Sequence, residues 1–301
     1  MTFRLAHLSD PHLGSLPRPR LSELAGKRAL GFFNWHRKRR ALHQEDVLAE
    51  LITDMRSFKP DHLAVTGDLN NLSLEKEFEP ARAWLEALGT PHDVTVVPGN
   101  HDAYVGATAS HSGKHWGEFM TNDAVQVLVG QEITYPFVRR RGSIVMIGLS
   151  TAVPTLPFMA TGELGSEQIA RFARTLAELK QEGLFRVVLI HHPPKSSPGQ
   201  RFRRLLDARR FRAVLAEHGA DLVLHGHNHV HSLVWLDGPK GRIPAFGVPS
   251  ASSPPHGRHD TAGYNIYEID GAPGAWQCTA VLRSLRADGE GFFERAREKV
   301  A

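Results

Sequence analysis

The chain has 301 residues, of which 41% are hydrophobic and 23% are charged, a composition typical of a globular protein with a large core. No apolar run approaches the roughly 20 residues that span a bilayer, and the first residues lack the pattern of a signal peptide. The single cysteine, Cys278, excludes an intrachain disulfide and a cysteine-based metal site, so we expect a cytoplasmic protein.

The formal net charge of +4 is unevenly distributed along the chain. Residues 18–40 contain eight Lys and Arg and one Glu, so this segment carries +7 and the rest of the chain carries −3. A broad basic track of the kind that binds a nucleic-acid backbone is therefore not indicated, and we expect no nucleic-acid partner.

Short apolar runs alternate with amphipathic segments along most of the chain. The apolar runs predict strands at 3–9, 62–66, 94–97, 134–138, 143–149, 185–190 and 221–224. The amphipathic segments predict helices at 22–40, 44–58, 75–88, 166–181 and 207–218. After residue 230 the pattern changes to short strands, which we expect at 231–237, 242–247, 263–269 and 276–283.

This alternation predicts an α/β fold whose mixed sheets are mainly parallel at the centre, with helices outside. No repeat or linker divides the sequence, so we expect a single domain over residues 1–301. A basic and aromatic segment at about 13–43 interrupts the alternation as an insertion. Arg139, Arg140 and Arg141 are expected in the exposed turn of a hairpin.

Five polar motifs follow predicted strands. They are Asp10-Pro11-His12, Gly67-Asp68, Gly99-Asn100-His101-Asp102, His191-His192-Pro193-Pro194 and Gly226-His227-Asn228-His229. Because ligands of open α/β sheets gather at the carboxyl ends of strands, we expect these motifs to form one site.

The candidate metal ligands are a mixture of carboxylate, amide and imidazole groups without a thiolate. This donor set suits manganese, iron, zinc or cobalt better than calcium. Seven ligands are too many for one catalytic ion but suffice for two ions that share a carboxylate, and two ions can stabilise an in-line displacement at phosphorus. A neighbouring histidine that is not a ligand can protonate the leaving oxygen. The candidate ligands are Asp10, His12, Asp68, Asn100, His191, His227 and His229.

In this order, the motifs resemble those of the calcineurin-like metallophosphoesterase superfamily over about residues 3–250. The resemblance implies a four-layer α/β/β/α sandwich with two mixed β-sheets. It also implies roles for the motif residues: Asp10, His12 and His229 on one ion, Asn100, His191 and His227 on the other, and Asp68 as the bridge. His101 would stabilise or protonate the leaving group, Asp102 would orient His101, and His192 is the alternative to His191.

The His-His-Pro-Pro and Gly-His-Asn-His motifs are most similar to the bacterial branch that includes class III cyclic-nucleotide phosphodiesterases and glycerophosphodiesterases. The resemblance implies a phosphodiesterase with two transition-metal ions (Mn, Fe or Zn), in which a bridging hydroxide attacks phosphorus. A non-catalytic scaffold and a nuclease on the same fold are the alternatives.

The insertion has three interpretations. It is a solvated charged helix, a lid or dimer contact over the site, or a membrane-surface element formed by residues 22–40. In the third case Phe32, Phe33 and Trp35 would lie among lipid headgroups beside the basic run 37–40. That interpretation suggests a lipid-linked pyrophosphohydrolase at the inner face of the membrane.

Overall fold

We analysed a computed structural model that describes residues 2–14, 16–24, 26–37, 42–123, 133–197, 199–255 and 260–301. The basic residues Lys38, Arg39 and Arg40, on which the membrane hypothesis partly rests, lie outside these ranges. Within the ranges, no helix combines the length and the apolar character needed to cross a membrane.

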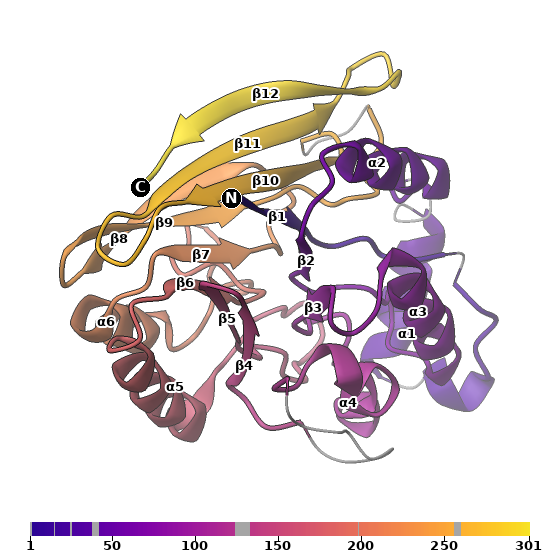
Figure 1. The fold of residues 1–301 in the computed structure, drawn as a ribbon. Helices are drawn as coiled ribbons and strands as arrows, with labels where there is room; N and C mark the ends of the chain where they lie inside the picture. Colours follow the sequence, from indigo (N-terminus) through magenta and orange to yellow (C-terminus); the bar gives the residue numbers. More distant parts are fainter. Residues whose placement is uncertain are drawn as a thin grey trace.

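The strands form two six-stranded mixed sheets, as the resemblance implies (Figure 1). In the first sheet the order is β12-β11-β10-β1-β2-β3. The three strands from the first third of the chain run parallel to one another, and the C-terminal strands extend the sheet in antiparallel fashion. Their bounds are β1 Phe3–Leu8, β2 His62–Val65, β3 Val94–Val96, β10 Gly263–Asp270, β11 Gln277–Leu285 and β12 Phe292–Lys299.

The second sheet has the order β4-β5-β6-β7-β9-β8. Its four central strands are parallel, and the edge strands β4 and β8 are antiparallel to their neighbours. The bounds are β4 Phe137–Arg141, β5 Ile144–Gly148, β6 Phe185–Leu189, β7 Leu222–His225, β8 Ser232–Gly238 and β9 Gly241–Gly247.

Successive side chains of the central strands face the core between the two sheets and the helices outside in turn. Met146 and Val187 face the core shared by the two sheets, whereas their neighbours Val145 and Val188 face the helices outside the second sheet. The helices α5 (Gly165–Leu179) and α6 (Ala208–His218) cover that outer face. The helices α2 (Glu45–Ser57) and α3 (Glu75–Leu88) pack their apolar faces against the first sheet. The result is the expected α/β/β/α sandwich.

The insertion is less helical than its pattern predicts. A short 3-10 turn, η1 (Leu21–Leu24), precedes the helix α1 (Lys27–Arg37), and Gly26 with a φ of 64° separates them. The side chain of Trp35 is only 5% exposed, so the expectation that it lies among headgroups is wrong. Phe33, in contrast, is 60% exposed.

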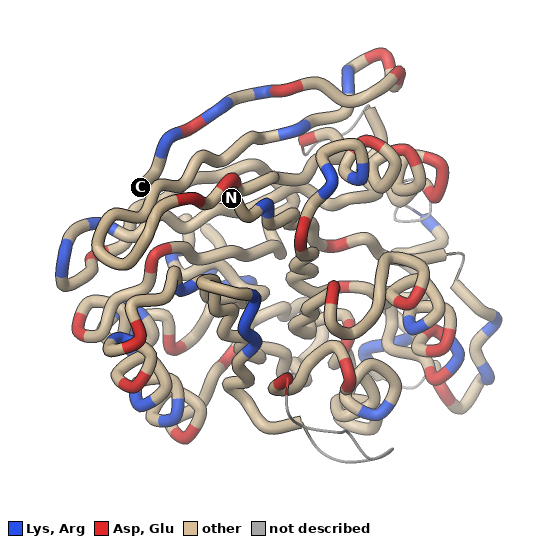
Figure 2. The backbone as a smooth tube through the Cα atoms, in the orientation of Figure 1, with Lys and Arg blue, Asp and Glu red and all other residues tan. Residues whose placement is uncertain are grey.

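The strand β12 was not expected, because its sequence lacks alternating apolar residues. Only its first residue, Phe292, is buried, and its charged residues include both signs (Figure 2). A charged edge strand of this kind resists pairing with a further strand. The irregular region after β3 contains η3 (Gly106–Thr108), α4 (His111–Trp116) and η4 (Gly117–Phe119).

The expected position of the arginines in a hairpin turn is also wrong. Arg139, Arg140 and Arg141 belong to β4, and the turn to β5 is made by Gly142 and Ser143. The guanidinium of Arg139 is buried and donates hydrogen bonds to four backbone carbonyls, at Thr121 (2.8 Å), Val94 (2.9 Å), Pro91 and Glu118. Arg139 therefore fastens β4, at the edge of the second sheet, to the strand β3 of the first.

We predict that Arg139→Ala lowers the free energy of unfolding by about 2–4 kcal/mol, because buried carbonyls lose their donor. Arg140→Ala is the matched control, since the Arg140 side chain is half exposed and pairs with Glu182 at the surface. That change should cost at most about 1 kcal/mol. Urea denaturation of both variants measures the difference, and equal losses would contradict the structural role of Arg139.

Candidate metal centre

The predicted ligands lie in loops at the carboxyl ends of five parallel strands. The first sheet contributes Asp10 and His12 after β1, Asp68 after β2 and Asn100 after β3, and the second sheet contributes His191 after β6 and His227 and His229 after β7. All of them are buried except His229, which is partly exposed. The site is therefore assembled where the ends of both sheets meet.

The ligand atoms form overlapping groups within which all atoms lie less than 4.8 Å apart. Asn100 joins them through its Oδ1 atom, which lies 3.2 Å from His191 Nε2. The groups are Asp10 with His12 and His229, Asp10 with Asp68 and His191, and His191 with His192 and His227. Because the groups share Asp10 and His191, all seven predicted ligands belong to one cluster.

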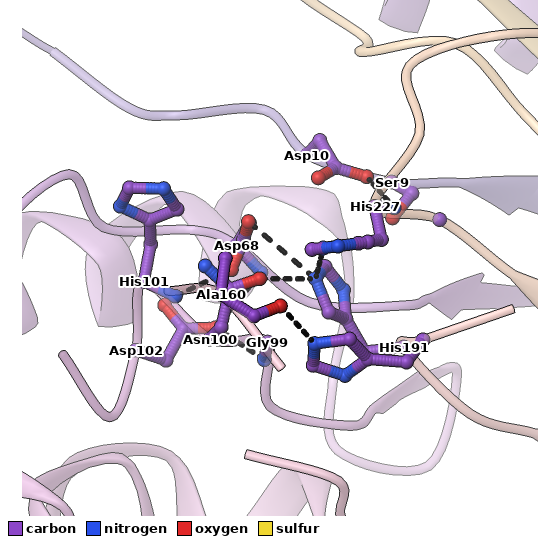
Figure 3. Close-up of polar contacts among 12 residues, drawn as sticks. Ser9, Asp10, Asp68, Gly99, Asn100, His101, Asp102, Ala160, His191 and His227 are labelled. Carbon is purple, nitrogen blue, oxygen red and sulfur yellow. Dashed lines mark hydrogen bonds and ion pairs between the residues drawn. The ribbon is translucent and has the colours of Figure 1, made fainter. Parts of the chain in front are cut away.

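The carboxylate of Asp68 occupies the middle of the cluster. Its Oδ2 atom lies 3.9 Å from His12 Nε2 on one side and 3.5 Å from His191 Nε2 on the other. Figure 3 shows the side chains of Asp68 and Asn100 directed toward the ring of His191. One carboxylate is therefore within reach of both halves of the ligand set.

Backbone carbonyls fix the orientation of four imidazole rings. A carbonyl only accepts, so the ring nitrogen facing it carries the proton, and the other nitrogen is left to serve as a ligand or a proton carrier. The pairs are His12 Nδ1 with Asn70 O (3.1 Å), His101 Nδ1 with Asn71 O (2.5 Å), His191 Nδ1 with Thr66 O (2.6 Å) and His227 Nε2 with Arg203 O (2.9 Å).

The contacts of His192 favour His191 as the ligand of the pair. His192 accepts a hydrogen bond from the Thr151 hydroxyl at Nδ1 and donates from Nε2 to the carbonyl of Ala160, so both of its nitrogens are engaged. Burial and the neighbouring His191 lower the pKa of His192 to about 3. For His191, burial acts in the same direction, but the carboxylates of Asp68 and Asp10 and the carbonyl of Thr66 together outweigh it and raise the pKa to about 9. The position between Asp68 and His191 therefore favours positive charge.

Five of the seven predicted ligands have left-handed backbone conformations. Such conformations are uncommon for residues other than glycine and concentrate at functional sites. In the described ranges only eight non-glycine residues have a positive φ. The five ligands among them are Asp10 (52°), His12 (44°), Asp68 (56°), His227 (71°) and His229 (55°).

Two motif glycines allow the loops to approach each other closely. A Cβ atom on Gly99 would lie 2.5 Å from the backbone nitrogen of Asp68 and closer still to Asp68 Oδ1. A Cβ atom on Gly226 would collide with the side chains of Ser9 and Asp10. These positions exclude larger residues because neighbouring ligand loops fill the space.

The side chain of Asp102 contacts the backbone of the loops that carry the ligands. Its carboxylate accepts hydrogen bonds from the backbone nitrogens of Asp68, Asn70 and Gly99, each at 2.9 Å. Burial and the nearby Asp68 raise the pKa of Asp102 to about 7. Asp102 therefore holds the loop after β2 against the loop after β3.

Sequence reasoning missed two residues that border the cluster. The ring of His43, at the end of the insertion, lies 4.3 Å from the ring of His12. The ring of Tyr104 stacks on His101 at 5.3 Å. Neither belongs to a motif. The only signal for Tyr104 is its closeness to the Gly-Asn-His-Asp motif, and His43 is separated from His12 by the whole insertion.

The donor set fits transition-metal ions. It combines carboxylate and amide oxygens with imidazole nitrogens, the rings are held by carbonyls, and Asp68 can contact two ions. The fold and the site together define a class of protein. Its members are two-sheet α/β sandwiches that carry, at the ends of their strands, a cluster of His and Asp residues able to bind metal ions.

The family model of the calcineurin-like phosphoesterases matches residues 3–231, and the chain belongs to this family. A search of curated protein sequences gave no match.

Similar folds occur among solved structures. A dimetal phosphatase from Danio rerio is 10% identical, with 99% of this chain and 98% of that chain covered and a TM-score of 0.59. A purple acid phosphatase from yellow lupin (Lupinus luteus) seeds is 12% identical, with 98% of this chain and 53% of that chain covered and a TM-score of 0.62. At these identities the similarity establishes the fold.

We predict that Gly99→Ala lowers the affinity of the protein for Mn²⁺ or Zn²⁺ by about 10–100-fold, because the added methyl group displaces Asp68. Gly106→Ala is the control, since a Cβ atom there meets nothing within 4 Å. Metal titration of the two variants tests the effect, and equal affinities would show that Gly99 has no part in placing Asp68.

Proposed function

We propose that this protein is a dinuclear metal-dependent phosphodiesterase. The observation that carries the proposal is the position of the Asp68 carboxylate between His12 and His191, within 4 Å of both. A phosphoester hydrolase with two ions needs such a bridging ligand, and membership of the family supports this class of reaction.

Each half of the cluster supplies a separate set of donors. Asp10, His12 and His229 would hold one ion, Asn100, His191 and His227 would hold the other, and Asp68 would contact both. The mixture of oxygen and nitrogen donors suits Mn, Fe or Zn. Ions bound there supply Lewis-acid chemistry, which polarises phosphoryl oxygens and lowers the pKa of water.

His101 is the proposed proton donor to the leaving oxygen. Its Nδ1 donates to the carbonyl of Asn71, which leaves Nε2 as the atom that carries the transferable proton. The ring lies 5.0 Å from the ring of His12 and stacks on Tyr104, so it borders the cluster in a fixed orientation. A histidine in this position can transfer a proton without binding a metal ion.

The charges beside the cluster favour a diester over a monoester. Lys27 and Arg203 border the site, but Lys27 donates to Thr155 and Met159, and Arg203 donates to the carbonyl of His227. A diester carries one negative charge and a monoester about two near neutral pH, so side-chain cations that are already engaged offer a monoester little beyond the metal ions. The complete donor set speaks against a non-catalytic scaffold. The buried thiol of Cys278 suits the reducing cytoplasm that we propose as the compartment.

The proposal is tested by stripping the protein of metal, refilling it with manganese, iron or zinc, and comparing hydrolysis of bis-p-nitrophenyl phosphate and p-nitrophenyl phosphate. We expect metal-dependent activity with a higher kcat/KM for the diester. Faster cleavage of the monoester would place the protein among phosphatases, and inactivity with every metal would overturn the proposal.

We predict that His101→Ala retains the metal and lowers kcat by about 10²–10⁴-fold, with the largest loss for substrates whose leaving group has a high pKa. Asp68→Asn is the contrasting variant, because it should lose metal and activity together. Metal analysis by mass spectrometry alongside kinetics separates the two. Loss of metal in His101→Ala would assign His101 to the ligand set instead.

A further inference from the structure

Most of the exposed large apolar side chains described in this protein belong to three segments of the chain. In the described ranges nine large hydrophobic residues are exposed, and eight of them belong to three segments, residues 21–42, 156–158 and 202–206. The ninth, Phe293, lies on β12. The eight residues, which we call the apolar rim, are Leu21, Leu30, Phe33, Leu42, Leu156, Phe158, Phe202 and Leu206.

The first segment belongs to the insertion, whose two ends lie at the candidate metal centre. The chain leaves the site at His12 and returns at His43, whose ring lies 4.3 Å from that of His12. Within the insertion, the guanidinium of the buried Arg28 donates to the carbonyls of Leu72 and Ser73, and Trp35 is buried. The insertion is therefore anchored to the body of the protein while Leu21 (91% exposed) and Phe33 project from it.

Hydrogen bonds join the other two segments to the first and to the site. Lys27 donates to Thr155 and Met159 beside the second segment. The backbone nitrogen of Ala160 donates to the carbonyl of Phe202 at 2.8 Å, which joins the second segment to the third. His227 then donates to the carbonyl of Arg203. The three segments are thus linked to one another and, through His227, to the cluster.

Phe158 is the most unusual member of the apolar rim. It is 87% exposed and has a φ of 66°, a left-handed conformation that is rare for an aromatic residue. An exposed side chain on a strained backbone adds nothing to the stability of the isolated chain. Strain of this kind is typical of sites that contact a ligand or a surface.

Exposed arginines accompany the apolar side chains. Arg18 and Arg20 precede Leu21, the guanidinium of Arg37 lies 5.3 Å from the ring of Phe33, and that of Arg201 lies 4.3 Å from the ring of Phe202. Arg204 is exposed beside them. Apolar tips next to cationic groups match the chemistry of an anionic bilayer surface, where the tips enter the headgroup region and the cations meet lipid phosphates.

We infer that the apolar rim docks this protein on an anionic lipid bilayer, with the candidate metal centre facing the headgroups. A bilayer is favoured over a protein partner because the most exposed of these side chains, Leu21, Leu156 and Phe158, are each more than 70% exposed and come from two different segments. Fluid lipid surrounds separate tips without needing a complementary shape, whereas a protein interface buries a continuous and matched patch.

Vesicle flotation tests this inference without turnover, so the result is independent of the proposed function. We expect the protein to float with vesicles of phosphatidylglycerol and phosphatidylcholine at low salt, and to bind much less to phosphatidylcholine alone. The double variant Leu156→Ser/Phe158→Ser should bind the anionic vesicles at least about tenfold more weakly than the wild type, because two apolar side chains no longer enter the headgroup region.

Phe293→Ser is the matched control, since it removes an exposed apolar residue outside the rim and should leave vesicle binding unchanged. Thermal melts should show that both variants fold like the wild type, because the replaced side chains are exposed. The inference is wrong if the wild type does not bind anionic vesicles at low salt, or if Phe293→Ser weakens binding as much as the double variant. It is also wrong if light scattering shows that the rim residues instead hold two copies of the chain together.

Discussion

Two buried carboxylates that accept hydrogen bonds from backbone N–H groups hold the candidate metal centre together. Asp102 binds three backbone nitrogens and joins the loops after β2 and β3. Asp10 Oδ2 accepts from the backbone nitrogen of His227 at 3.0 Å, across 217 residues of sequence, and so joins the first sheet to the second. The ligand loops lie beyond the ends of their strands. These contacts therefore set the distances between donors that the sheets alone would leave undefined.

The same contacts explain how the strained backbone persists. Each left-handed residue other than glycine costs on the order of 1 kcal/mol or more, and five of the predicted ligands adopt this conformation. In a strand, successive side chains point to opposite faces, so a ligand placed there would face the core or the helices. The left-handed residues turn the chain at each strand end and bring the side chains toward one centre. The packed cores of the two sheets provide the stability that such turns require.

The fold class and the clustering of the ligands could be predicted because each polar motif directly follows an apolar run. Strand ends that share a sheet edge must lie close together, so local patterns were sufficient for Asp68, Asn100 and His227. The contacts of Arg139 and His43 could not be predicted in this way. Their surroundings are built by segments distant in sequence, such as the carbonyls of residues 91–121 around Arg139. Likewise, β12 has no apolar alternation because it lies at a solvated edge.

The position of the insertion connects the two proposals. Because its ends are fixed at His12 and beside His43, residues added between them lie at the border of the site and leave the order of the strands unchanged. The added residues here are basic and bear exposed apolar tips, whereas the cluster they border is polar and buried. A phosphate ester anchored in the bilayer would place its ester at the cluster while its apolar part stays among the lipids around the rim. A free nucleotide or a sugar phosphate would gain nothing from the rim. If the protein acts at a bilayer, selection of a lipid substrate therefore requires no separate apolar pocket, since the membrane keeps the apolar part of the substrate and presents only the ester.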